Sequence, residues 1–165
     1  MSVIAAKVYN DKIIMAADSI LCSGWSKRNN NFAKIIELNG MIAGSTGTAQ
    51  EASLMWHYMQ THKPASASEK DILEFVVEFS QWKSSIDGNK VENAYLFAYK
   101  GHLFEINNMF VHEILDFAAV GAGEDYANAA LYLGHSPREA VKVACELCCF
   151  VCEPIIEYTM QKEAS

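Results

Sequence analysis

The turns between β-prone segments are the feature that most restricts how this chain can fold. Asn39-Gly40 joins apolar runs at 32–38 and 41–46, and Asn-Gly between such runs is the strongest short-range signal for a β-hairpin. Asn10-Asp11 joins β-prone runs at 2–9 and 12–18 in the same way, which predicts a second hairpin. Sequence neighbours are therefore expected to pair as antiparallel strands.

The remaining elements are expected in blocks. Helices are predicted at 48–60 and 68–87, strands at 93–99, 102–106, 110–114 and 117–120, helices at 125–133 and 136–149, and a last strand at 155–160, with a polar loop at 22–31. Strands and helices grouped in runs, rather than alternating singly, favour an α+β class with antiparallel sheets covered by helices. No linker or repeat divides the chain, so residues 1–165 are expected to form a single domain.

Composition excludes several classes of partner. The formal net charge of −7 disfavours nucleic acid and anionic membranes, which attract basic surfaces. No apolar run approaches the length of a membrane span, and the N-terminus lacks the pattern of a secretory signal. Five cysteines, an odd number, then indicate reduced thiols and a cytoplasmic protein.

Four positions near the N-terminus can be combined into one active site. Ser2, once Met1 is removed, carries both a hydroxyl nucleophile and an α-amine that can act as its base. Asp18 ends the strand paired with the one that Ser2 begins, and Lys34 opens the next strand after a loop long enough to return to the same end of the sheet. A lysine ammonium beside the amine favours the neutral amine. Gly44, where a strand approaches a helix, is the candidate for a backbone N–H that stabilises an oxyanion.

These segments resemble the proteasome β-subunit family of N-terminal-nucleophile (Ntn) hydrolases, and within it the short bacterial HslV-type peptidase. The similar segments are Ser2-Val-Ile-Ala-Ala, Ile-Met-Ala-Ala-Asp18-Ser, Ala-Lys34-Ile, Ile-Ala-Gly44-Ser-Thr-Gly47 and Ala119-Val-Gly-Ala-Gly-Glu-Asp-Tyr-Ala-Asn-Ala-Ala130. Counted from Ser2 as the first mature residue, Asp18 and Lys34 fall on the family's catalytic acid and lysine. A chain with no propeptide beyond Met1 also suits the HslV type.

The resemblance implies a four-layer αββα sandwich assembled into homo-oligomeric rings around a chamber. It further implies a peptidase acting on unfolded polypeptide, with an ATPase unfoldase as partner and no cofactor. Ser2 takes the place of the family's threonine, which retains the hydroxyl and the amine. By analogy Leu21, Ile42 and Thr46 line the pocket for the substrate side chain, and packing within strands explains them equally well.

Two positions depart from the family pattern. Ala122 stands where the family has a serine, and Phe150 stands near the position of an aspartate, for which Glu153 is a substitute only if the backbone is shifted. The missing groups support the amine rather than react. A catalytically weak or inactive structural ring protein, or a small-amide Ntn hydrolase, therefore stays open as an alternative function.

The cysteines near the C-terminus invite a metal interpretation, which spacing disfavours. Cys145, Cys148, Cys149 and Cys152 fall on one face of a helix if it continues through them. Four thiolates along one straight stripe are too far apart to close a tetrahedral zinc site. We therefore expect core packing and no metal.

Overall fold

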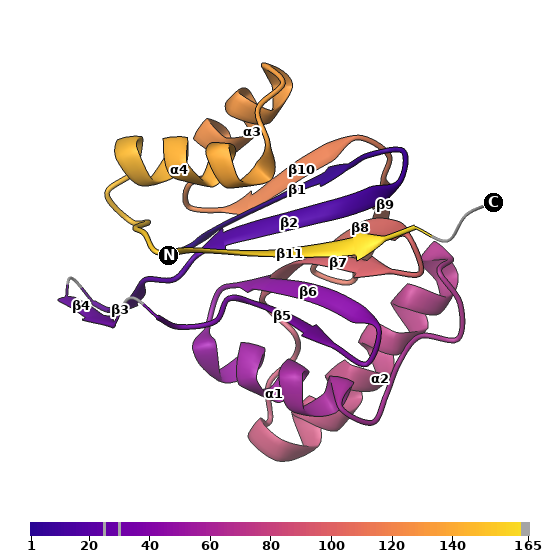
Figure 1. Cartoon of the computed structure of the whole chain (residues 1–165). Helices are drawn as coiled ribbons and strands as arrows, with labels where there is room; N and C mark the ends of the chain where they lie inside the picture. Colours follow the sequence, from indigo (N-terminus) through magenta and orange to yellow (C-terminus); the bar gives the residue numbers. More distant parts are fainter. Residues whose placement is uncertain (25, 30, 163–165) are drawn as a thin grey trace.

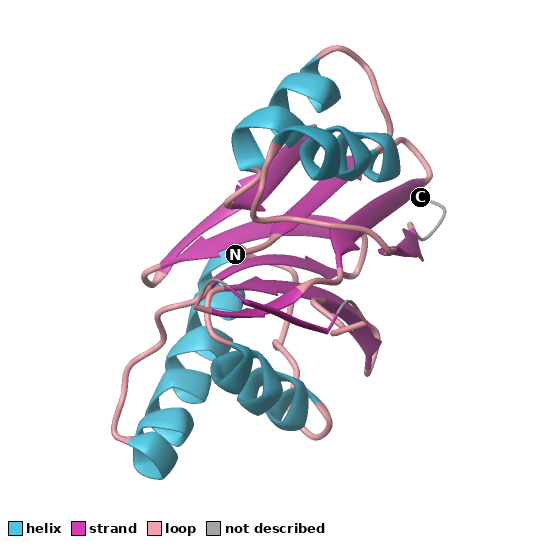
Figure 2. Cartoon of the chain, turned by 90° about the vertical axis from the view of Figure 1, so that its left-hand side faces the viewer, coloured by secondary structure: helices cyan, strands magenta, loops and turns pink. Residues whose placement is uncertain are grey.

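The computed structural model describes residues 1–24, 26–29 and 31–162, which stack in four layers (Figures 1 and 2). Sheet 1 consists of β10 (Phe117–Gly121), β1 (Val3–Val8), β2 (Lys12–Asp18) and β11 (Ile155–Gln161), in that order. Sheet 2 consists of β5 (Ile35–Leu38), β6 (Met41–Thr46), β7 (Ala94–Tyr99), β8 (His102–Asn107) and β9 (Phe110–Ile114), in that order. Helices α3 (Glu124–Tyr132) and α4 (Pro137–Leu147) cover sheet 1, and α1 (Ala49–Met59) and α2 (Glu69–Asp87) cover sheet 2. The predicted αββα architecture with antiparallel sheets is confirmed.

Apolar side chains fill each of the three spaces between the layers. Along β1, Val3 and Ala5 face α3 and α4, whereas Ile4 and Ala6 face sheet 2. This alternation follows from the two-residue period of a strand, and both faces are buried because sheet 1 is covered on both sides. The third space, between sheet 2 and helices α1 and α2, is filled mainly by larger side chains such as Phe79.

Turn and cap residues in the sequence predicted where several strands and helices begin or end. Asn39 and Gly40 have φ values of 54° and 77°, as a two-residue turn between twisted antiparallel strands requires. Ser136 caps α4: its side chain accepts from the Glu139 N–H, the Glu139 carboxylate accepts from the Ser136 N–H, and Pro137 opens the helix. These hydrogen bonds are local, which is why the sequence predicts them.

Two predictions of local structure need correction. The predicted loop at 22–31 contains a short hairpin of β3 (Leu21–Ser23) and β4 (Ser26–Asn29); residues 25 and 30 lie outside the described residues. The hairpin turns through Gly24, whose φ is 58°. Its strands are only three and four residues long, too short for the alternating apolar pattern by which strands are recognised in a sequence.

The second correction concerns the cysteine stripe. Helix α4 ends at Leu147, and the backbone at Cys148 is already extended. Cys148 packs into the core between α4 and sheet 1, as predicted, but Cys149 is exposed and Cys152 lies beyond the helix. The helix ends here because the chain must return to pair β11 with β2. Sequence periodicity carries no information about that pairing.

Candidate active site

The strand register brings the N-terminus against Asp18. Ile4 pairs with Ala17 in the β1–β2 ladder, so the next position of β1 lies beside the end of β2. The Val3 N–H donates to Asp18 Oδ1 at 2.8 Å, and the Ile20 N–H donates to Oδ2 at 3.3 Å. Asp18 is fully buried, and these backbone donors hold its carboxylate in one orientation.

Lys34 completes this cluster from the other sheet. Its Nζ lies 2.8 Å from Asp18 Oδ2, and its side chain is only 4% exposed. The Lys34 carbonyl accepts from the Ser45 N–H at 2.9 Å, which ties the residue to the end of β6. The buried ion pair therefore joins sheet 1 to sheet 2 directly beneath Ser2.

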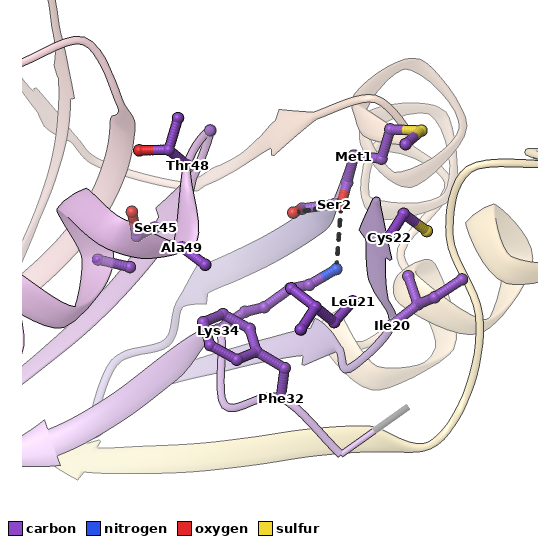
Figure 3. Close-up of a pocket in the computed structure, with 12 residues that line it drawn as sticks. Met1, Ser2, Ile20, Leu21, Cys22, Phe32, Lys34, Ser45, Thr48 and Ala49 are labelled. Carbon is purple, nitrogen blue, oxygen red and sulfur yellow. Dashed lines mark hydrogen bonds between the residues drawn. The ribbon is translucent and has the colours of Figure 1, made fainter. Parts of the chain in front are cut away.

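Ser2 and Lys34 point toward the same oxygen atom. The Ser2 hydroxyl donates to the Met1 carbonyl at 2.6 Å. Lys34 Nζ donates to the same carbonyl at 3.2 Å (Figure 3). In this structure Met1 is attached, so the Ser2 nitrogen is a peptide nitrogen and not an amine. The hydroxyl and the ammonium thus already converge on the position next to the Ser2 nitrogen.

Burial changes the acidity of the groups around Asp18. It lowers the pKa of Lys34 below its ordinary value, and the charge of Asp18 and the hydrogen bond to it oppose that fall. Burial also raises the pKa of the Cys145 thiol to about 12, and the negative charge of Asp18 adds to the effect. Cys145 is therefore a neutral thiol at physiological pH and cannot compete with Ser2 as a nucleophile, since the thiolate is the reactive form.

A cavity of about 270 Å³ opens beside these groups. Its lining combines Met1, Ser2 and Lys34 with apolar side chains and with the start of α1; the other lining residues are Ile20, Leu21, Cys22, Phe32, Ser45, Gly47, Thr48, Ala49 and Ala52 (Figure 3). Leu21 is thus at the cavity wall. The only charged side chain among these lining residues is Lys34.

Gly44 and Ile42 lie away from the cavity. Gly44 is in the interior of β6, paired with Ile35 of β5 on one side and with Leu96 of β7 on the other. Its N–H is therefore directed at a neighbouring strand. Ile42 packs between the sheets, and Thr46 ends β6 with its hydroxyl 3.4 Å from the Ala94 carbonyl.

The space around Gly44 gives a structural reason for a glycine there. A Cβ at this position would lie 2.9 Å from Ile35 Cγ2 and 2.9 Å from both Cγ2 and Cδ1 of Ile4. Real Cβ atoms avoid such contacts, so Gly44 lets the two sheets approach each other.

Gly47, and not Gly44, lies at the junction between a strand and a helix that was predicted for Gly44. It follows β6 directly, lines the cavity and has a φ of 129°, a backbone conformation that suits glycine. Thr48 then caps α1 by accepting from the Glu51 N–H. In the sequence, the signal for a glycine at this junction was its position next to the helix N-cap Thr48. Spacing alone did not show whether Gly44 or Gly47 lies at the junction.

Comparisons with known proteins agree with this arrangement. No protein-family model and no curated protein matches the sequence. Among solved structures, BPH from Thiobacillus denitrificans in complex with epoxomicin matches with a TM-score of 0.88 at 20% identity, over 98% of this chain and 100% of BPH. A second BPH structure has a TM-score of 0.88 at 19% identity, over 99% and 100%. Eukaryotic HslV from Trypanosoma brucei has a TM-score of 0.75 at 16% identity, over 96% and 99%.

This chain has the HslV fold. The predicted resemblance is thereby confirmed at the level of architecture. The turn between β10 and α3 contacts the N-terminus, since the Gly123 N–H donates to the Ser2 carbonyl at 3.3 Å. A Cβ on Gly121, whose φ is 103°, would collide with the same carbonyl.

Of the two departures, Ala122 lies within this turn and Phe150 follows α4. Ala122 carries no hydroxyl, and its carbonyl accepts from Cys148 Sγ at 3.5 Å. Phe150 lies beyond the end of α4 and, with Met1, Cys22 and Cys149, lines a neighbouring cavity of about 240 Å³. Glu153 is exposed.

Within residues 1–24, 26–29 and 31–162, no group of three or more His, Cys, Asp or Glu side chains is arranged to hold a metal ion. No helix in that part of the chain is long and apolar enough to cross a membrane.

Proposed function

We propose that this chain is an Ntn-hydrolase peptidase whose nucleophile is Ser2, exposed when Met1 is removed. The observation that carries the proposal is the convergence of the Ser2 hydroxyl and Lys34 Nζ on the Met1 carbonyl, at 2.6 and 3.2 Å, above a buried Asp18. A lone serine near an N-terminus would support nothing. A serine held beside a buried lysine–aspartate pair and an open cavity supports nucleophilic catalysis.

The reaction proceeds through an acyl-enzyme. The Ser2 Oγ attacks the carbonyl carbon of the scissile peptide bond, and its proton passes to the α-amine of Ser2, a group that titrates near ~8 in model peptides. As the C–N bond breaks, the amine returns that proton to the leaving nitrogen. Water then attacks the ester, with the amine again as base, and releases the carboxylic acid product.

Lys34 and the turn after β6 stabilise the charges that develop in this reaction. The Lys34 ammonium, oriented by Asp18, disfavours protonation of the nearby amine and attracts the forming alkoxide. For the carbonyl oxyanion we propose the Gly47 N–H in place of that of Gly44, because Gly47 lines the cavity whereas Gly44 lies inside sheet 2. Hydrogen-bond donors of this kind contribute about 10²–10³-fold in rate.

The proposed substrate is unfolded polypeptide with an apolar side chain bound against Leu21 and its neighbours in the cavity. We further propose a homo-oligomeric ring in a cytoplasmic setting, with an ATPase unfoldase as partner. Support for the ring comes from large apolar side chains on the α3–α4 surface: Tyr132 is 80% exposed, Leu133 76% and Leu147 61%. Burial against further copies of the chain would remove this apolar surface from water.

Replacement of Ser2 tests the proposal directly. Ser2→Ala should abolish hydrolysis of fluorogenic peptides and leave oligomer size by light scattering unchanged. Ser53→Ala is the matched control, because Ser53 lies on the exposed face of α1 and its loss should leave hydrolysis at the wild-type rate. Retained hydrolysis in Ser2→Ala would overturn the assignment.

Intact-mass spectrometry separates this proposal from its main alternative. A mass lacking Met1 and one acyl adduct from a β-lactone-type inhibitor support the enzyme. Epoxomicin, which is bound in one BPH structure, should block that adduct by occupying the same cavity. Ala122 and Phe150 favour a structural ring protein without useful catalysis; a full-length mass and no adduct would support that function. A monomer or dimer by light scattering, with hydrolysis of small amides, would favour a small-amide hydrolase.

A further inference from the structure

The side chain of Asn93 holds both sides of the turn that lines the cavity. Asn93 Oδ1 accepts from the Thr48 N–H at 2.7 Å, and Nδ2 donates to the Thr48 carbonyl at 2.9 Å and to Ser45 Oγ at 2.8 Å. The residue is only 2% exposed. Its carboxamide thus uses its acceptor and both donor hydrogens on residues flanking Gly47, although it comes from the segment leading into β7.

The contact with Gly47 leaves the turn little freedom. A Cβ on Gly47 would collide with the Asn93 carboxamide, and it would come within 3.2 Å of the Asn93 Cα. The backbone at Gly47 therefore packs directly on Asn93, at a φ of 129°. The Gly47 backbone is thus held by hydrogen bonds at Ser45 and Thr48 and packed against Asn93, which restricts its rotation.

Asn93 is itself anchored by a buried carboxylate. Glu51 Oε1 accepts from the Asn93 N–H at 2.9 Å and from the Tyr95 hydroxyl at 2.8 Å. Glu51 Oε2 lies 3.6 Å from Lys83 Nζ, and both side chains are 3% exposed. Because Lys83 belongs to α2 and Glu51 to α1, this network fixes Asn93 to both helices that cover sheet 2.

We propose that Asn93 is a positioning residue for the oxyanion: it acts through Gly47, holding the Gly47 N–H in the direction of the carbonyl oxygen under attack. The inference rests on the proposed function and deepens it. A donor stabilises a transition state most when it is already oriented, since no reorganisation is then needed during the reaction. A carboxamide satisfied on all sides and held by buried charge supplies that rigidity.

The test compares Asn93→Ala with Val76→Ala in the peptidase assay. Val76 is fully buried among the side chains between α2 and sheet 2, so its truncation lowers stability without touching the turn. We expect kcat to fall about 30- to 100-fold in Asn93→Ala with KM within about threefold of wild type, the pattern of a contact made only in the transition state. Val76→Ala should keep the wild-type kcat at 25 °C.

A transition-state analogue provides a second readout. A peptide boronate forms a tetrahedral adduct with the serine hydroxyl, and its affinity should fall in Asn93→Ala by about the same factor as kcat/KM. A loss of stability alone would not lower the boronate affinity and kcat/KM by the same factor. The isosteric Asn93→Asp, which keeps the acceptor for the Thr48 N–H but sets a carboxylate beside the Thr48 carbonyl, covers failure of the alanine variant to fold; it should lose about tenfold or more in kcat.

The outcomes distinguish the two levels of the proposal. If the wild-type protein hydrolyses peptides and both Asn93 variants keep kcat within threefold of it, the positioning role is overturned and the peptidase function stands. An equal loss in Val76→Ala would assign the effect to stability and would also overturn it. A wild-type protein that does not hydrolyse peptides would overturn the proposed function and this inference together.

Discussion

Removing the charge of Asp18 without changing its shape tests how strongly Lys34 depends on it. In Asp18→Asn the side-chain oxygen can still accept from the Val3 N–H, the 2.8 Å bond of the wild type. Lys34 Nζ loses a counter-charge at 2.8 Å while its side chain stays only 4% exposed. Breaking a buried pair in this way costs about 3–5 kcal/mol, because a charge is left without a partner.

Deprotonation of Lys34 limits that cost. Neutralising a lysine at pH 7 against its ordinary pKa of 10.5 spans 3.5 pH units, or about 4.8 kcal/mol at ~1.36 kcal/mol per unit. The variant should therefore lose about 3–5 kcal/mol of unfolding free energy at pH 7. Where folded Lys34 is neutral and unfolded Lys34 is protonated, the unfolded state binds one more proton. The free energy of unfolding of Asp18→Asn then rises by about 1.4 kcal/mol per pH unit, up to the ordinary pKa of lysine.

The double variant Asp18→Asn/Lys34→Met is the control for this slope. It removes the lysine that titrates and fills its place with an apolar chain, so most of the lost stability should return, with no such rise with pH. Urea unfolding followed by tryptophan fluorescence at pH 7, 8 and 9 measures all three proteins. If Asp18→Asn costs less than about 1 kcal/mol and its slope equals that of the double variant, Lys34 is hydrated and the argument from burial fails. Under the proposed function, the double variant should fold and have no peptidase activity.

Two further predictions concern packing and alkaline pH. Gly44→Ala should lose about 1–3 kcal/mol of unfolding free energy in the same urea assay, because the new Cβ lies 2.9 Å from atoms of Ile4 and Ile35; a value within about 0.5 kcal/mol of wild type would contradict the close approach of the sheets. The raised pKa of Cys145, about 12 against an ordinary 9.0, means that folded protein keeps a proton that the unfolded chain loses, so stability should fall as pH rises from 9 toward 12. Cys145→Ala should show a shallower fall over that range, and parallel curves for the two proteins would rule out the effect.

Turns and caps could be predicted from the sequence because their chemistry is local. Asn39-Gly40 and the Ser136-Pro137 cap both act on backbone groups within a few residues, and both appear in the structure as expected. The end of α4 could not be predicted in this way. Cys148 belongs to a periodic stripe that favours continuing the helix, and the pairing of β11 with β2 overrides it.

At the candidate site, sequence spacing identified the residues that strand ends bring together. Ser2, Asp18 and Lys34 each lie at or beside the end of a strand, and strand ends meet once the hairpins close. The candidate oxyanion donor could not be predicted from spacing in the same way. In the sequence both Gly44 and Gly47 come shortly before a predicted helix, and the position of each relative to the cavity depends on the strands that flank β6.

The sequence by itself determined the antiparallel hairpins and the grouped helices; its family resemblance implied the αββα layering, and the strand ends predicted the contact between Asp18 and Lys34. Only the tertiary structure decided that Gly44 lets the two sheets approach each other, that Gly47 lines the cavity, and that the Asn93 side chain packs against Gly47. The physical reason is distance along the chain. Turn and cap hydrogen bonds join near neighbours, whereas the shape of a cavity wall depends on groups such as Asn93 and Glu51, which meet only after both sheets and their helices have packed.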